Sequence, residues 1–129
     1  MSHYVRIRTQ LRERNMLLRS LQDLGLPFEE GERLAVRGDP KKKEWADVIV
    51  TASPDADIGL RYNGEAYDIV ADWYRIEQTG DLRREQFLKD LQRRYSYQLV
   101  LDQAKEQNLI VEEERLEDGE IVLVLSVRG

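Results

Sequence analysis

The chain contains 129 residues, of which 41% are hydrophobic and 35% are charged, and its formal net charge is -5. A chain of this size commonly forms one domain whose core is large enough to fold without covalent staples. Because it has no Cys and a single His, the composition excludes disulfide frameworks, thiolate nucleophiles and Cys- or His-rich metal sites.

No segment predicts membrane insertion or export. The longest apolar run, residues 121–125, is far shorter than the roughly 20 residues that a membrane-spanning helix needs. Residues 1–10 are polar and basic where a signal peptide would be apolar. We therefore expect a soluble, cytoplasmic protein.

The first third of the chain predicts a strand, a helix and a short strand. Residues 3–11 alternate between apolar and polar side chains, which indicates a half-buried strand. Leucines at helical spacing over residues 14–24 predict a helix that ends at Gly25. Residues 28–30 favour a short strand, whereas Gly38, Pro40 and the lysines that follow make residues 31–44 an exposed excursion.

A hairpin centred on Asn63-Gly64 is the clearest local signal. Residues 45–51 are rich in β-formers, and Asn63-Gly64 between two alternating segments predicts a two-residue type I′ turn. That turn would set the register, with apolar pairs on one face: Tyr62–Glu65, Leu60–Tyr67, Ile58–Ile69 and Ala56–Ala71. The other face would be acidic and exposed, with the pairs Asp55–Asp72, Asp57–Val70 and Gly59–Asp68.

The last third predicts helices and a second hairpin. Asp81 can cap a helix, and two offset apolar stripes over residues 87–95 and 97–104 predict a kink or a break near Ser96. Strands over residues 109–115 and 121–127 flank an Asp118-Gly119 turn, and the last strand, apolar on both faces, should lie in the middle of the sheet or under two layers. The expected fold is α+β in one domain of residues 1–129, a mostly antiparallel sheet with helices packed on one face, in the order strand, helix, strands, helix pair and hairpin.

A resemblance rests on several short motifs in these elements. They are Met1-Ser2-His3-Tyr4, Thr9-Gln10, Asp23-Leu24-Gly25, Asp57-Ile58-Gly59, Asn63-Gly64, Val70-Ala71-Asp72 and Arg94-Tyr95-Ser96-Tyr97. In this order they resemble, over nearly the whole chain, the small family of a hypothetical chloroplast reading frame, number thirty-five, of plastids, cyanobacteria and other bacteria. The resemblance implies a stand-alone domain, cytosolic or, if plastid-encoded, stromal, and brings no catalytic residue. Members often have His at the position of Gln98, so any chemistry of that His would be in doubt here.

The aspartates of the first hairpin form a candidate metal site. Like charges that face each other across paired strands destabilise a sheet, so Asp55, Asp57, Asp68 and Asp72 need compensation. A hard cation such as Mg²⁺ or Ca²⁺ would supply it, and so would Arg61, a neighbouring strand or water. A solvated charged face is the more common outcome, and the sequence requires no cofactor.

His3 is the second candidate. Its place beside Val5 and Ile7 favours a partly buried His satisfied by a backbone group. Alternatively, His3 and the free α-amino group could together bind Cu²⁺ or Ni²⁺ or a ligand if Met1 is retained.

Two basic stretches are candidates for nucleic-acid binding. Lys41, Lys42 and Lys43 form one, and Arg93 and Arg94 on the second helix belong to the other. With nearby aromatic residues they could contact single-stranded nucleic acid. Interspersed acids and the negative net charge disfavour this function.

Aromatic residues near the end of the hairpin and the helix break are a candidate partner surface: Trp73, Tyr74, Tyr95 and Tyr97. Core packing is their default role, although such residues are also enriched at interfaces. No nucleophile with a base, paired-carboxylate cleft or phosphate-binding glycine loop is recognisable. We therefore expect a non-enzymatic accessory protein that binds another protein, with self-association through the last strand as a further option. The alternatives are a metal- or nucleotide-dependent regulator or enzyme that uses the hairpin aspartates, and a nucleic-acid binder.

Overall fold

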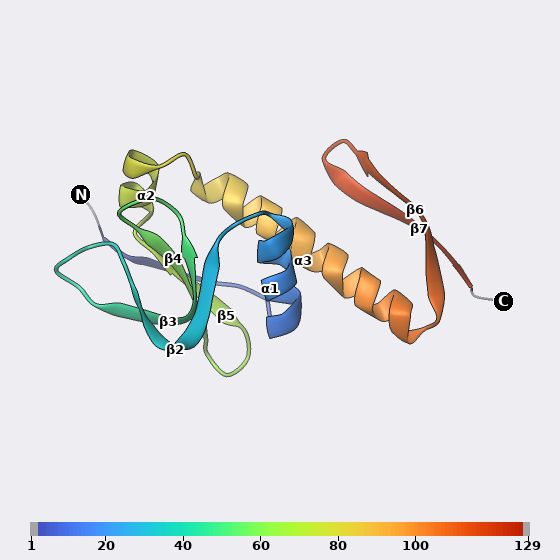
Figure 1. Ribbon diagram of the computed structural model, residues 1–129, viewed down its shortest axis with the longest axis horizontal. Helices are drawn as coiled ribbons and strands as arrows, with labels where there is room; N and C mark the ends of the chain where they lie inside the picture. The colour runs from blue at the N-terminus through green and yellow to red at the C-terminus, as the bar shows by residue number, and fades with distance from the viewer. Residues whose placement is uncertain (1–2, 128–129) are drawn as a thin grey trace.

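The computed structural model describes residues 3–127 and has the expected α+β architecture (Figure 1). Its elements are β1 (Val5–Arg8), α1 (Arg14–Asp23), β2 (Phe28–Val36), β3 (Glu44–Thr51), β4 (Asp57–Tyr62), β5 (Tyr67–Ala71), α2 (Trp73–Thr79), α3 (Arg84–Glu106), β6 (Leu109–Glu117) and β7 (Glu120–Val127). Five strands form one sheet in the order β1-β5-β4-β3-β2, and β6 and β7 form a separate two-stranded sheet. Every strand pairing is antiparallel.

The core lies between the inner face of the five-stranded sheet and the helices. Two rows of paired apolar residues cross this face. The first row is Val5, Ala71, Ile58, Val50 and Phe28. The second row is Ile7, Ile69, Leu60 and Val48. Leu17 and Leu21 of α1, Ile76 of α2 and Leu91 of α3 are buried in the same cluster. Burial of each such side chain contributes about 1.5–3 kcal/mol, so this face determines where the helices lie.

Helix α1 receives its N-terminal cap from a distant aromatic residue. Its N-cap residue, Glu13, makes no side-chain capping bond. Instead, the buried hydroxyl oxygen of Tyr95 accepts hydrogen bonds from the backbone N–H groups of Arg12 and Glu13, at 2.9 and 2.8 Å. The helix ends as predicted, with Gly25 at a φ of +69°. Tyr95 therefore links α3 to the start of α1.

Two helices follow the first hairpin, but they are not the two pieces predicted on either side of Ser96, because α2 covers Trp73–Thr79, where no helix was predicted. α3 is a continuous helix of 23 residues that passes through Ser96 without interruption. The break lies between α2 and α3, where Gly80 follows the last residue of α2 and Arg83 is the N-cap of α3. The prediction failed there because the offset between the two apolar stripes reflects two different contacts of one helix, with the sheet and with the β6–β7 hairpin.

Residues 31–36 are strand rather than the start of an exposed excursion. β2 continues to Val36 through a register shift between Glu30 and Leu34, where Arg33 has a φ of +52°. This distorted strand carries Val36 to the outer face of the sheet, where it forms a small second core with Ala46 and Ile49. The distortion is a β-bulge, a feature that bends a strand and hides its alternation in the sequence.

The Asn63-Gly64 hairpin is present, but its predicted register is wrong by two residues. Tyr62 pairs with Tyr67 and Ile58 with Ala71. Four residues form the connection, because the side-chain oxygen of Asn63 accepts hydrogen bonds from the N–H groups of Glu65 and Ala66 at 2.9 and 3.1 Å. A shift of two residues leaves every side chain on its predicted face.

The last strand is not central in a sheet, contrary to the prediction. β7 pairs with β6 alone, and this hairpin packs beside α3, apart from the five-stranded sheet (Figure 1). Its turn is as expected, since Asp118 and Gly119 have φ values of +49° and +80° between the paired residues Glu117 and Glu120.

Candidate functional site

Three of the four aspartates of the first hairpin, Asp57, Asp68 and Asp72, are buried and have separate partners, so the prediction that these side chains face solvent holds only for Asp55. Asp57 is 3% exposed, and its carboxylate accepts bonds from the guanidinium and backbone N–H of Arg37 at 2.9–3.2 Å. Hydrogen bonding to Asp57 raises the pKa of Arg37. Arg37 directly follows β2, so the end of that strand positions the residue that covers the Asp57 carboxylate.

The other two aspartates of this face have different partners. Asp68 lies between Arg8 and Arg61 in register and accepts a bond from the side-chain amide of Asn63 at 3.0 Å. Asp72 caps α2 through the N–H of Arg75 at 3.1 Å. Within residues 3–127, no three acidic or His side chains come together as a possible metal site. The structure therefore does not gather the four predicted ligands.

His3 is exposed rather than part of the apolar face. The α-amino group with which it could bind a metal belongs to Met1, outside the described residues.

The two basic stretches do not form one surface. Lys41, Lys42 and Lys43 are exposed in the β2–β3 connection, which lies at the end of the molecule opposite the β6–β7 hairpin (Figure 1). Arg93 lies against that hairpin and pairs with Asp90, whereas the guanidinium of Arg94 lies 5.3 Å from the ring centre of Tyr97.

The four aromatic candidates divide into core and surface. Trp73 and Tyr95 are each 4% exposed and belong to the core, so only Tyr74 and Tyr97 are accessible. Tyr97 donates its hydroxyl to Glu114 at 2.8 Å. Partial burial, followed by this bond, raises the pKa of Tyr97. Gln98, where the resemblance implied a His, is buried and donates to Asp23 at 2.6 Å, a structural link between α3 and α1.

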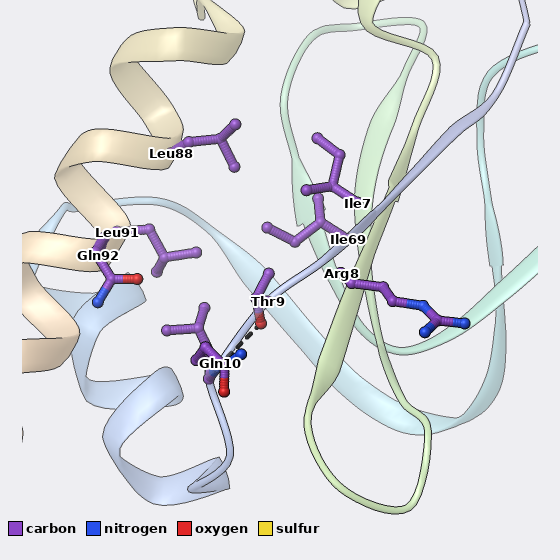
Figure 2. A pocket seen from close by; sticks show the side chains of 9 residues that line it. Ile7, Arg8, Thr9, Gln10, Ile69, Leu88, Leu91 and Gln92 are labelled. Carbon is purple, nitrogen blue, oxygen red and sulfur yellow. Dashed lines mark hydrogen bonds between the residues drawn. The ribbon is translucent and has the colours of Figure 1, made fainter.

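A groove that the sequence did not predict lies between β1 and α3. Figure 2 shows Ile7 and Ile69 of the sheet opposite Leu88 and Leu91 of α3, with Thr9, Gln10 and Gln92 near one end. The groove has a volume of about 360 Å³ and is also lined by Arg8 and Leu11. We call it the β1–α3 groove. It is predominantly apolar.

The groove lies at an unpaired sheet edge. β1 is the terminal strand of the five-stranded sheet and pairs only with β5 in the described part of the chain. Thr9 follows the last residue of β1 and fixes the end of this strand. Its hydroxyl donates to the carbonyl of Tyr67 at 2.6 Å and accepts from the N–H of Leu11 at 3.0 Å. The exposed Arg6 and Arg8 form no ion pair with any residue between 3 and 127. The edge strand β1 is therefore basic, although the net charge of the protein is negative.

The β6–β7 hairpin is the second apolar surface. Of the eight large hydrophobic residues exposed in the described chain, five belong to it: Ile110, Val111, Leu116, Val124 and Val127. Its contact with α3 includes Ile121 and Leu123. An isolated two-stranded sheet is marginally stable in water, and exposed apolar patches often mark interaction sites. The sequence signal for this surface was the apolar last strand, which the prediction placed in the sheet.

Comparisons with known proteins identify a family. The family model described as "Protein of unknown function (DUF1257)" matches residues 20–124. Proteins named "Uncharacterized protein ycf35" are similar over 97% of this chain and 96% of their own length, with 32% identity in Guillardia theta, 29% in Pyropia yezoensis and 27% in Cyanophora paradoxa. No solved structure matches the chain significantly. Among the described residues no helix is sufficiently long and apolar to span a membrane. The chain belongs to the DUF1257 family, as the resemblance of its sequence motifs implied.

Proposed function

We propose that the chain is a non-enzymatic protein-interaction module that receives an extended segment of a protein partner in the β1–α3 groove. One observation carries the proposal: among residues 3–127 the sheet ends at β1 with an unpaired outer edge, and the apolar side chains of α3 beside that edge line a groove. The β1–α3 groove would then be the binding site for the protein partner that the composition and motifs led us to expect.

Strand addition is the binding mode that suits this geometry. An extended peptide that pairs with a sheet edge obtains affinity from main-chain hydrogen bonds and specificity from pockets that accept alternate side chains. A strand added to β1 would lie about 4.8 Å from it, with every second side chain directed toward the helices. Leu88 and Ile7 would then contact these side chains.

The lining favours binding over catalysis. It consists of five aliphatic side chains, one threonine, two glutamines and Arg8. Catalysis by proton transfer or nucleophilic attack requires a base within reach of the reacting group, and an amide, a hydroxyl and a guanidinium do not supply one at neutral pH. The aliphatic lining instead matches the apolar character of binding pockets.

Affinity purification with a matched pair of variants tests the proposal. Leu88 lines the groove, whereas Leu82 lines a different pocket, and both are partly buried against the main core. We expect tagged wild type and Leu82→Lys to retain the same proteins from a native lysate, and Leu88→Lys to lose them. Circular dichroism would verify that both variants are folded. Equal retention by the two variants, or no retained protein with wild type, would contradict the proposal.

A further inference from the structure

We infer that the segment received by the β1–α3 groove is strand β6 of a second copy of this chain, so that two copies associate reciprocally. The inference rests on the proposed function and names its partner. The residues around the groove require an incoming strand that is apolar on one face and acidic on the other. Strand β6 of the same chain comes near to both requirements.

The incoming strand must differ on its two faces. Toward the helices it would meet Ile7 and Leu88, so apolar side chains are required there. On the opposite face it would lie beside Arg6 and Arg8, which project away from Ile7 because successive residues of a strand alternate. Acidic side chains are required on that face, since opposite charges across paired strands are stabilising and like charges are destabilising.

Strand β6 has this pattern. Its pairing with β7 places Leu116 on the side of the hairpin that contacts α3, because its partner Ile121 lines the pocket there. Leu109, Val111 and Glu114 pair with β7 residues of the same side, and Glu114 bonds Tyr97 of α3 there. Glu113 and Glu117 lie on the other side, joined by Arg115 at 2.7 and 2.8 Å. Four Glu and one Arg make the strand acidic, whereas β1 contains two Arg and no acid. Apart from Glu114, the side of β6 that carries Leu109, Val111 and Leu116 therefore matches the helices, and the side that carries Glu113 and Glu117 around Arg115 matches the arginines.

The strand must come from another copy. Within one chain β6 is held beside α3 by the bond between Glu114 and Tyr97, and it belongs to a sheet separate from β1 (Figure 1). In the described part of the chain its outer edge is unpaired, as is that of β1. Pairing of β6 with β1 of a second copy would join two strands to five and leave helices on the same side of both parts. A marginal two-stranded ribbon would thereby become part of a larger sheet.

Charge reversal on each side of the contact provides a test with purified protein alone. One variant carries Arg6→Glu and Arg8→Glu, and the other carries Glu113→Arg and Glu117→Arg; all four positions are exposed. Sedimentation velocity over a concentration series should show a dimer for wild type and a dissociation constant at least about tenfold higher for each variant. In an equimolar mixture both reciprocal contacts become attractive, so the dissociation constant should return to within about threefold of wild type.

The outcomes separate this inference from the proposed function. A wild-type protein that remains monomeric at all concentrations, or a mixture as monomeric as its two components, would overturn the second copy as occupant. If Leu88→Lys still lost proteins from a lysate in that case, the groove would remain a protein-binding site for another strand. Dimerisation that is unchanged in both variants would place the contact elsewhere and would also overturn the inference.

Discussion

The hydroxyl of Tyr95 should be worth about 2 kcal/mol of folding free energy. Replacement by Phe keeps the ring in the core and removes the acceptor of two backbone hydrogen bonds, those from Arg12 and Glu13. A backbone N–H that loses its partner costs about 1–3 kcal/mol when it is buried. The side chains of Arg12 and Glu13 are exposed, so water can partly replace the hydroxyl and the low end applies to each. The sum of about 2 kcal/mol corresponds to a fall in Tm of roughly 6–10 °C for a chain of this length.

Urea unfolding followed by circular dichroism measures this loss. Tyr74→Phe is the matched control, because Tyr74 is 54% exposed and its hydroxyl has no hydrogen-bond partner in the described chain; its effect should be below about 0.5 kcal/mol. If Tyr95→Phe destabilised the protein as little as the control, the hydroxyl would not be the cap of α1. The explanation for why α1 lacks a capping side chain of its own would then be refuted.

Three further perturbations test the outer face of the sheet. Arg37→Met should lower the free energy of unfolding by about 2 kcal/mol because Asp57 would remain a buried carboxylate, and urea titration would reveal it; an unchanged midpoint would contradict this. Gly59→Ala should cost about 1–3 kcal/mol, since its Cβ would lie 2.6 Å from Cγ2 of Val36, and Val36→Ala should partly rescue it. Burial, followed by neighbouring acids, raises the pKa of Tyr4 above 10.0. The stability that its neutral hydroxyl contributes is therefore complete below about pH 10 and is lost as pH rises through the higher folded pKa. Urea titrations should show that Tyr4→Phe loses less stability than wild type between about pH 9 and pH 11.

Sequence patterns predicted the inner face of the sheet well because one physical requirement controls it. Ile58, Leu60 and Ile69 must face the helices whatever the turn, and a register error of two residues does not alter their side of the sheet. Because the apolar pattern does not change with a shift of two residues, it also could not reveal the error in the predicted register of the hairpin. Asn63 can form either a two-residue turn or a longer one closed by its own side chain, and the apolar pattern is compatible with both.

The outer face was harder to predict because its cover comes from a distorted strand. Gly31 and Arg33 interrupt the alternation of β2, and the positive φ of Arg33 is a conformation that its residue type does not announce. Without the continuation to Val36, Asp57 and Asp68 face solvent in any reading of the sequence. The burial of Asp57 therefore depends on a contact with Arg37, about 20 positions away in the chain, which local patterns do not encode.

The β1–α3 groove could not be predicted because it depends on which strand ends the sheet. Sequence alternation shows that residues 5–8 form a strand, but strand order is a property of long-range pairing. The hairpin surface did leave a signal, since a last strand that is apolar on both faces needs cover on both. The sequence analysis expected that cover from within one chain and named self-association through the last strand as an option, and the second-copy inference supplies the contact from another copy through β6.

Arginines on an edge strand can also act to prevent unwanted strand pairing, a role different from binding a partner strand. Charged side chains commonly prevent edge strands from pairing with one another, and Arg6 and Arg8 would oppose the pairing of β1 with β1 of another copy. This protection is selective, because the same charges attract an acidic strand. The two roles therefore predict different behaviour: a purely protective edge would leave the wild type monomeric, whereas a selective edge would allow the wild type to dimerise and would make each charge-reversal variant dimerise more weakly. Dimerisation of the wild type that both charge reversals weaken is accordingly the observation that distinguishes a binding edge from an edge that only prevents pairing.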